Sequence, residues 1–394
     1  MNRTTAVLAT AGAVTSLVTS LVSSGLSPAS ASDNHGPSHD EPRVVTALDG
    51  PRGVDALGHG RTLVTETDGS FSLVVERRHG PAKVIGLGAL ATDFPPAIAL
   101  GRHGTVFLLT GASSGPPEDA RAARVLTADE VEPQPAAGAT LYRWRPGWDA
   151  PRPFADIGAY QVGDPDPADL EGVPADSNPF GLAALQDGSV LVADAAGNDL
   201  LRVDRRGHIT TVARLLPRVV EVPEGLPEVP PEAGGPLPPA GTPIPSEAVA
   251  TSVTVGEDGA WYVGELRGFP ATPGTSQVWR IRPGTVGATC NPQAPRTGPC
   301  TRYADGLTSI VDLAAGRRGV YALELSKQSW FATELGLPGS EVGGLFLISK
   351  HGRGTRLHEL APGRLITPGG VDVSGRDVYV AGPLFGPGAL LGIG

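Results

Sequence analysis

The chain has 394 residues, of which 54 are glycine and 39 are proline. Together these two residues reach about twice their usual share of about 12%, which excludes a protein of long helices or coiled coils because both disrupt helix interiors. The formal net charge of −10 makes DNA, RNA and anionic lipids poor candidate partners, since these polyanions bind basic patches. We therefore expect a turn-rich, all-β protein that binds no nucleic acid.

Residues 1–31 have the features of a secretory signal peptide. Arg3 gives a short positive start, residues 6–26 are apolar, and Ala29-Ser30-Ala31 is the small-residue pattern that precedes a cleavage site. A membrane anchor is the alternative, but repeated Thr and Ser weaken a span that needs about 20 strongly apolar residues. We expect cleavage after Ala31, a secreted mature chain without a membrane span, and a disordered lead at residues 32–42.

The most informative feature is a repeated unit, which is clearest in residues 178–213. Its sequence is NPFGLAALQDGSVLVADAAGNDLLRVDRRGHITTVA. Short strands are expected at 181–184, 189–193, 200–203 and 209–212, separated by turns rich in Gly, Asp and Asn. The unit therefore predicts a four-stranded antiparallel meander.

The strand–turn–strand pattern of this unit recurs along the chain. The copies span residues 51–66, 95–110, 179–194, 250–265, 309–324 and 368–381. One meander cannot bury both of its faces, whereas several packed radially bury a continuous core. We therefore predict an all-β, six-bladed β-propeller of four-stranded antiparallel blades over residues 43–394. The last copy lacks a fourth strand, so the strand expected at 43–48 completes it and closes the ring.

Insertions separate the copies unevenly, at about 111–139, 158–177 and 215–246. The second insertion is acidic and the third is proline-rich, which predicts an extended surface loop because proline lacks an amide donor. The two cysteines of the chain, Cys290 and Cys300, lie in the stretch TCNPQAPRTGPC. In an exported chain this close pair is expected to form a disulfide, and a metal-binding pair is the alternative.

A fifteen-residue step joins the start of the first strand of a copy to the end of its second strand. Antiparallel pairing brings these two points to the same end of a blade, so the step places several strand ends on one face near the central axis. The residues at these ends are Glu66, Thr110, Asp194, Glu265 and Glu324, and Asn178 is expected beside them.

Carboxylates gathered at a channel mouth have two explanations. Like-charge repulsion raises their pKa values or recruits a cation, and carboxylate and amide oxygens suit calcium. Alternatively, each carboxylate accepts backbone amides of the following turn, a structural cap that Asp194 before AAGN fits well. Glu66, Asn178, Asp194, Glu265 and Glu324 are thus candidate ligand- or ion-binding residues, with capping as the explanation that we favour. No catalytic residue is assigned.

Further stretches of the chain carry a family resemblance. They are ADIGAYQVGDPDP (155–167), DSNPFGLAAL (176–185), VLVADAAGNDLLRVD (190–204) and TSVTVGEDGAWYVGELRGFPATPG (251–274). These stretches resemble the ScyD/ScyE family of exported propellers, and the unit at 178–213 is similar to an NHL-type blade. The resemblance covers most of residues 43–394 and implies export and a six-bladed propeller. It implies no reaction mechanism.

Two functions are compatible with these features. The first is an exported, non-enzymatic, monomeric propeller that binds a protein partner or a small ligand on its loop-rich face. The alternative is a metal-dependent hydrolase of lactones or esters, which would use calcium held by the acidic residues at the channel mouth. Calcium is the one candidate cofactor.

Overall fold

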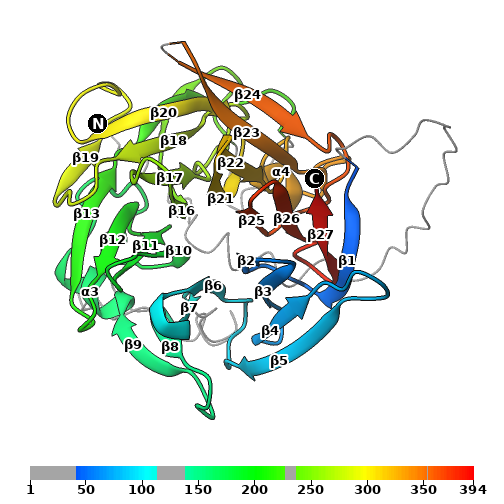
Figure 1. Cartoon of the computed structure of the whole chain (residues 1–394). Helices are drawn as coiled ribbons and strands as arrows, with labels where there is room; N and C mark the ends of the chain where they lie inside the picture. The colour runs from blue at the N-terminus through cyan, green and yellow to red at the C-terminus, as the bar shows by residue number, and fades with distance from the viewer. Residues whose placement is uncertain (1–40, 113–137, 227–236, 353) are drawn as a thin grey trace, which may run out of the picture.

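The strands of the chain form six antiparallel blades arranged in a ring (Figure 1). The computed structural model describes residues 41–112, 138–226, 237–352 and 354–394. The predicted six-bladed, all-β propeller is confirmed. The signal peptide expected at 1–31 lies outside the described residues, as does most of the lead expected at 32–42.

Within each blade the first strand lies beside the central axis and the last lies at the rim (Figure 1). Blade 1 comprises β2 (Val54–Gly58), β3 (Arg61–Thr65), β4 (Ser70–Val75) and β5 (Lys83–Ala89). Blade 2 comprises β6 (Ala97–Leu100), β7 (Val106–Thr110), β8 (Thr140–Trp144) and β9 (Arg152–Asp156). Blade 3 comprises β10 (Pro179–Ala184), β11 (Val190–Asp194), β12 (Asp199–Val203) and β13 (Ile209–Leu215). Blade 4 comprises β16 (Ala250–Val255), β17 (Trp261–Glu265), β18 (Ser276–Ile281) and β20 (Cys300–Leu307). Blade 5 comprises β21 (Ile310–Gly316), β22 (Gly319–Glu324), β23 (Gly344–His351) and β24 (Gly354–Leu360). Blade 6 comprises β25 (Gly370–Ser374), β26 (Asp377–Gly382), β27 (Pro387–Ile393) and β1 (Arg43–Asp49).

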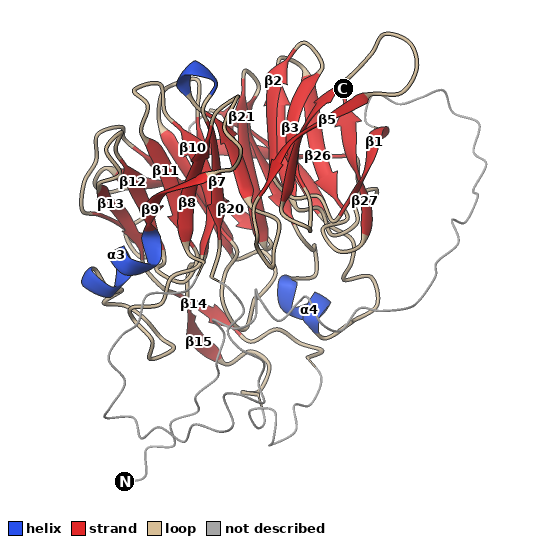
Figure 2. Ribbon diagram, turned by 90° about the horizontal axis from the view of Figure 1, so that it is seen from below, coloured by secondary structure: helices blue, strands red, loops and turns tan. Residues whose placement is uncertain are grey.

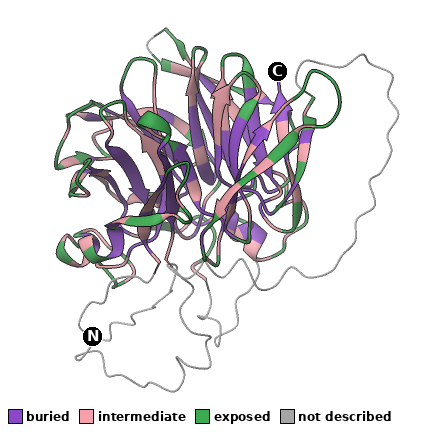
Figure 3. Cartoon of the chain, turned by 60° about the horizontal axis from the view of Figure 1, so that its bottom comes forward, coloured by how far each residue is buried: buried purple, intermediate pink, exposed green. Residues whose placement is uncertain are grey.

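The hydrophobic core lies between neighbouring blades. One cluster joins Leu63 and Phe71 of blade 1 to Ile98 and Leu108 of blade 2. Similar clusters join the other blades, and buried residues follow the strands while exposed residues gather in the turns (Figure 3). Every blade thus depends on both neighbours, because burial of apolar area is the main source of stability.

The ring is closed by the N-terminal strand, as predicted. β1 pairs antiparallel with β27, with Thr46 opposite Leu390 and Ala47 opposite Ala389, so it becomes the outer strand of blade 6. Val45 and Leu48 of β1 are buried against Leu390. The two ends of the described chain therefore share one sheet.

The predicted disulfide between Cys290 and Cys300 is present. Cys290 ends β19 (Ala288–Cys290), a short strand that pairs parallel with β13 of blade 3. Cys300 begins β20, the outer strand of blade 4. The bond therefore does more than close one loop, because it fastens the rim of blade 4 to the sheet of blade 3.

The meander gives the propeller two different faces. The connections between first and second strands and between third and fourth strands emerge at one face, which we call the hairpin face. The remaining connections emerge at the opposite face, which we call the loop-rich face. Figure 2 shows α3 (Ile157–Gly163), α4 (Trp330–Glu334) and the β14–β15 hairpin on that side of the ring. None of the described helices is long and apolar enough to cross a membrane.

The insertions differ in part from the sequence expectation. The insertion at 158–177 begins within α3, which starts at Ile157 after the N-cap Asp156 and ends at Gly163. Residues of the proline-rich insertion form the hairpin β14 (Arg218–Glu221) and β15 (Pro243–Ser246), where an extended loop was expected. Two of its prolines fit because they occupy an edge strand of a two-stranded ribbon. Residues 113–137 and 227–236 of the insertions lie outside the described part of the chain.

Deleting residues 43–48 should lower the melting temperature sharply, because it exposes the edge of β27 and the apolar residues that β1 covers. Differential scanning calorimetry measures the effect. Val44→Ser is the control, since Val44 lies in the same strand with 63% of its surface exposed, and it should leave the melting temperature nearly unchanged. An unchanged melt after the deletion would contradict closure by β1.

Candidate functional site

The candidate acidic residues all lie at the loop-rich ends of second strands. Glu66 follows β3, Asp194 ends β11, Glu265 ends β17 and Glu324 ends β22. The structure does not gather them into one site, since each has its own hydrogen-bond partners within or beside its blade. None of them lines the axial cavity.

Three of these carboxylates make the same structural contact. Glu66 Oε1 accepts the amide of Asp49 at 2.8 Å, Asp194 Oδ1 accepts the amide of Asn178 at 2.7 Å, and Glu324 Oε1 accepts the amide of Thr308 at 2.7 Å. Each bond ties the end of a second strand to the segment that enters the first strand of the same blade. The regular spacing therefore reflects a repeated cap of the backbone.

Asp194 belongs to a larger buried network in blade 3. Its carboxylate also accepts bonds from Ser177 Oγ at 2.6 Å, Gly197 N at 3.2 Å and Gln161 Nε2 at 3.3 Å. Burial raises the pKa of Asp194, and these hydrogen bonds oppose the rise. Gln161 of α3 also donates to Asp199 at 3.1 Å. Burial, together with the nearby charge of Asp194, raises the pKa of Asp199 well above its usual range.

Asn178 and Thr110 have local roles as well. Asn178 Oδ1 accepts the amide of Ala112 at 3.1 Å, which links blade 3 to the connection that leaves β7. Thr110 Oγ1 donates to the carbonyls of Thr140, at 3.3 Å, and Gly138. Asn178 therefore holds the start of the insertion at 111–139, and Thr110 holds its end.

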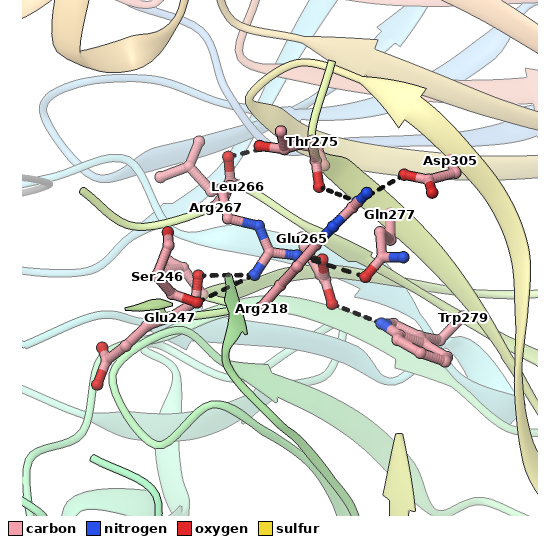
Figure 4. Close-up of polar contacts among 12 residues, drawn as sticks. Arg218, Ser246, Glu247, Glu265, Leu266, Arg267, Thr275, Gln277, Trp279 and Asp305 are labelled. Carbon is pink, nitrogen blue, oxygen red and sulfur yellow. Dashed lines mark hydrogen bonds and ion pairs between the residues drawn. The ribbon is translucent and has the colours of Figure 1, made fainter. Parts of the chain in front are cut away.

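Glu265 is the centre of a buried network that holds the β14–β15 hairpin (Figure 4). It pairs with Arg267 and accepts the indole N–H of Trp279 at 2.5 Å. Arg267 also donates to the carbonyls of Ser246 at 3.3 Å and Glu247 at 3.1 Å. Burial raises the pKa of Glu265, and the charge of Arg267 opposes that rise. The pair thus anchors the end of β15 to blade 4.

A second arginine fastens the other strand of this hairpin. Arg218 of β14 donates to the carbonyl of Thr275 at 3.1 Å and to Asp305 Oδ1 at 2.8 Å (Figure 4). Thr272 Oγ1 donates to the carbonyl of Glu221 at the end of β14, at 2.6 Å. Both strands of the hairpin are therefore held to blade 4 by polar contacts.

Apolar side chains close the axis at the loop-rich face. A small apolar cavity of about 30 Å³ is lined by residues that include Phe94, Phe180, Trp330 and Phe385. Trp330 of α4 donates its indole N–H to the carbonyl of Arg267 at 2.7 Å. This bond holds α4 in place, so that Trp330 helps to line the apolar cavity.

The axial cavity itself has a volume of about 270 Å³ and is lined by the first strands of all six blades. The last residue of each first strand is at least partly exposed, whereas the first residue is buried in five of the six. The cavity therefore opens toward the hairpin face and closes toward the loop-rich face.

Acidic side chains line this cavity that the sequence reasoning missed. Asp312 accepts the amide of Val371 at 2.8 Å, Asp372 accepts the amide of Ala56 at 2.6 Å, and Asp55 accepts the amide of Leu100. Each bond joins one blade to the next. Burial raises the pKa of Asp55 and of Asp312 to about 6. Burial, together with the charge of Asp55, raises the pKa of Asp372 well above its usual range. The triplets GVD (53–55 and 370–372) and IVD (310–312) were the available signal.

Arg52 lies at the inner end of the same cavity. Its guanidinium donates to the carbonyls of Pro95, at 2.9 Å, and Phe180, and its Cζ lies 3.9 Å from the centroid of the Phe180 ring. Burial lowers the pKa of Arg52 to about 10. This side chain therefore joins blade 1 to blades 2 and 3. Across the described residues, no group of three or more His, Cys, Asp or Glu side chains is placed to hold a metal ion, and ligand or calcium binding by the five candidates stays a prediction.

Comparisons with known proteins find only distant structural similarities. No protein-family model matches the chain, and no curated protein matches it. Among solved structures, the PQQ-bound aldose sugar dehydrogenase from Streptomyces coelicolor is 13% identical, with a TM-score of 0.49 and coverage of 89% of this chain and 96% of that one. Virginiamycin B lyase from Staphylococcus aureus is 12% identical, with a TM-score of 0.42 and coverage of 89% and 99%. A protein of unknown function from Dyadobacter fermentans is also 12% identical, with a TM-score of 0.44 and coverage of 89% and 96%. At such identities no chemistry is transferred from these proteins.

Replacing Glu265 by Gln should destabilise the fold by about 3 kcal/mol, because it leaves the buried Arg267 guanidinium without its charge partner. Urea unfolding followed by tryptophan fluorescence measures the loss. Glu257→Gln is the matched control in the same blade, with 61% of its side chain exposed, and should change stability by less than about 0.5 kcal/mol. Equal effects of the two changes would show that Arg267 does not need Glu265.

The ionisation of Glu324 should lower the free energy of unfolding as pH rises from about 4.5 to about 7. Burial raises the pKa of its folded form from 4.5 to about 7, so in that interval the folded chain holds a proton that the unfolded chain has released. Glu324→Gln removes this contribution, which amounts to at most about 3 kcal/mol.

Urea unfolding at several pH values should therefore show the variant gaining stability relative to the wild type as pH rises through this interval. Glu341→Gln is the control, since Glu341 is an exposed residue of the same face, and its stability should run parallel to that of the wild type. A constant difference between Glu324→Gln and the wild type would refute the raised pKa.

Proposed function

We propose that this protein is an exported, non-enzymatic propeller that binds a protein partner with its loop-rich face. The observation that carries the proposal is the way in which that face is built. The helices α3 and α4 and the β14–β15 hairpin all lie on it (Figure 2). Each is fastened to the blades by buried polar contacts, through Gln161, Trp330 and Arg267. A surface held in place before binding loses little entropy when a partner docks.

The exposed apolar residues of this face favour a protein partner. Leu170 and Val173 of the insertion at 158–177 are 47% and 49% exposed, and Val219 of β14 is 59% exposed. The amide of Leu170 donates to Glu247 Oε1 at 2.7 Å, so this insertion contacts the segment that follows β15. Apolar side chains within a polar rim are typical of protein-binding surfaces.

The charge of the same surface indicates the chemistry of the partner. The described insertion at 158–177 carries five acidic residues and no basic one. Asp166 is buried and Asp164 pairs with Arg214 at 2.7 Å, so Asp169, Glu171 and Asp176 are the acidic residues that this insertion adds to the surface. Glu221 and Glu224 are exposed in or beside the β14–β15 hairpin. A partner with basic and apolar side chains would complement this surface and would be attracted to it over a distance.

Export is part of the proposal. The signal-like residues 1–31 and the Cys290–Cys300 disulfide are both consistent with an extracellular protein. The ScyD/ScyE resemblance of the sequence supports the same compartment. It adds no activity.

Affinity capture with matched variants tests the proposed function. The mature chain, immobilised, should retain a specific protein from the exported fraction of the source cells. A double variant, Leu170→Asp with Val219→Asp, should lose that protein because both changes place charge on the docking surface. Val84→Asp is the control, since Val84 is 42% exposed on β5, away from the loop-rich face. Retention of the same protein by all three chains, or by none, would exclude this face as the binding surface.

A further inference from the structure

The hairpin face carries many arginines although the chain as a whole is acidic. In the described hairpin turns, blades 1, 2 and 3 contribute two each: Arg77, Arg78, Arg102, Arg145, Arg205 and Arg206. Blades 4, 5 and 6 contribute Arg282, Arg317, Arg318 and Arg376. All of them are exposed. The turns that join the strands of each blade thus form a basic surface.

These arginines are largely free of acidic partners. Among the described residues, the single ion pair that they form joins Arg317 to Glu257, with 4.0 Å between nitrogen and oxygen. Arg145 contacts Thr105 and the ring of Trp148, neither of which is charged. Their charge is therefore available to a ligand.

Half of the acidic residues of the same turns are already paired with cations of the strands. Arg43 pairs with Glu76 at 2.7 Å. Arg202 pairs with Asp187 at 2.5 Å, and Arg280 pairs with Asp258 at 3.0 Å. These three cations come from strands and not from the turns. Asp149, Asp204 and Glu257 are the other acidic residues of these turns, and the turn arginines outnumber them, so the turns keep a net positive charge.

We propose that the hairpin face binds the surface of an anionic lipid membrane. All six blades contribute arginines from their hairpin turns, and these turns emerge at the same end of the ring (Figure 2). A planar array of negative headgroups meets such a face with many turns at once, whereas a linear polyanion follows one line of them. Each arginine near an anionic bilayer contributes about 1 kcal/mol, and the attraction falls off within a Debye length.

The recess on this face is too local to account for the whole distribution. A cavity of about 360 Å³ between blades 4 and 5 is lined by residues that include Tyr262, Tyr303, Arg317 and Lys350. A soluble anionic polymer bound there would use the turns of two blades and leave the arginines of blades 1, 2 and 3 without a role. The spread of charge around the ring therefore favours the membrane.

This inference goes beyond the proposed function and fits with it. The two faces lie at opposite ends of every strand, so a propeller that rests on its hairpin face presents its loop-rich face away from the bilayer. The acidic charge of the loop-rich face also disfavours the reverse orientation. Membrane binding would then hold the partner-binding surface outward.

Vesicle co-sedimentation tests the proposal. The mature chain is mixed with vesicles of phosphatidylcholine alone or of phosphatidylcholine with phosphatidylglycerol, and binding is expected only to the second kind. Raising the salt to about 1 M, where the Debye length is about 3 Å, should release the protein. No binding to the anionic vesicles, or equal binding to both kinds, would overturn the proposal.

Matched variants identify the face. The charge reversal of Arg205, Arg206, Arg317 and Arg318 to Glu should weaken binding by at least about 100-fold. The same four positions changed to Lys keep the charge and should keep the binding. These side chains are exposed in turns, and an unchanged melting temperature verifies that both variants fold. Unaltered binding by the Glu variant would overturn the proposal.

A competition experiment with a soluble anionic polymer tests whether such a polymer, and not a membrane, is the ligand of the hairpin face. Dextran sulfate should compete with anionic vesicles only weakly if a planar surface is the ligand. Tight binding of dextran sulfate without binding to vesicles would replace the membrane by a polymer and overturn the proposal. The capture experiment with Leu170→Asp and Val219→Asp uses the opposite face, so the two proposals fail independently.

Discussion

Antiparallel pairing within each blade is the constraint on which the rest of this structure depends. A four-stranded meander places its two hairpin turns at one end and its other connections at the opposite end. Because each blade buries its sides only against its neighbours, all blades must point the same way around the ring. Repetition therefore creates two faces of different character, one of short turns and one of long connections, and closure by β1 leaves blade 6 with a complete sheet.

Buried polar groups hold the long connections in place. Their loss of water on burial costs free energy and shifts the pKa values of the carboxylates among them. Asp194, Glu265 and Glu324 each lose water on burial and regain hydrogen bonds from backbone or side-chain donors. Burial raises their pKa values, and the same pattern recurs at Asp55, Asp312 and Asp372 along the axis. Each of these carboxylates accepts a backbone amide from another segment, except Glu265, whose partners are the side chains of Arg267 and Trp279, so all of them hold separate segments of the chain together.

Particular elements show how far the sequence could predict this arrangement. The step from Pro179 to Asp194 predicted both the blade and the face on which Asp194 lies, because strand pairing depends on local spacing. The separation of Asp194, Glu265 and Glu324 into three networks depended on partners such as Gln161, Arg267 and Thr308, which lie in other strands and connections. The β14–β15 hairpin was missed because its strands lie in a proline-rich stretch and owe their place to Arg267 and Arg218.

The sequence by itself determined the number of blades, the closing strand and the disulfide, since each follows from a spacing that one stretch of chain carries. The net charge of −10 is a sum over the whole chain, and it does not say how the charge is distributed over the two faces. Arginines of the hairpin turns, from Arg77 to Arg376, are scattered along the chain. Only the tertiary structure decided that they share a surface, because closing the ring brings every hairpin turn to the same end of the propeller.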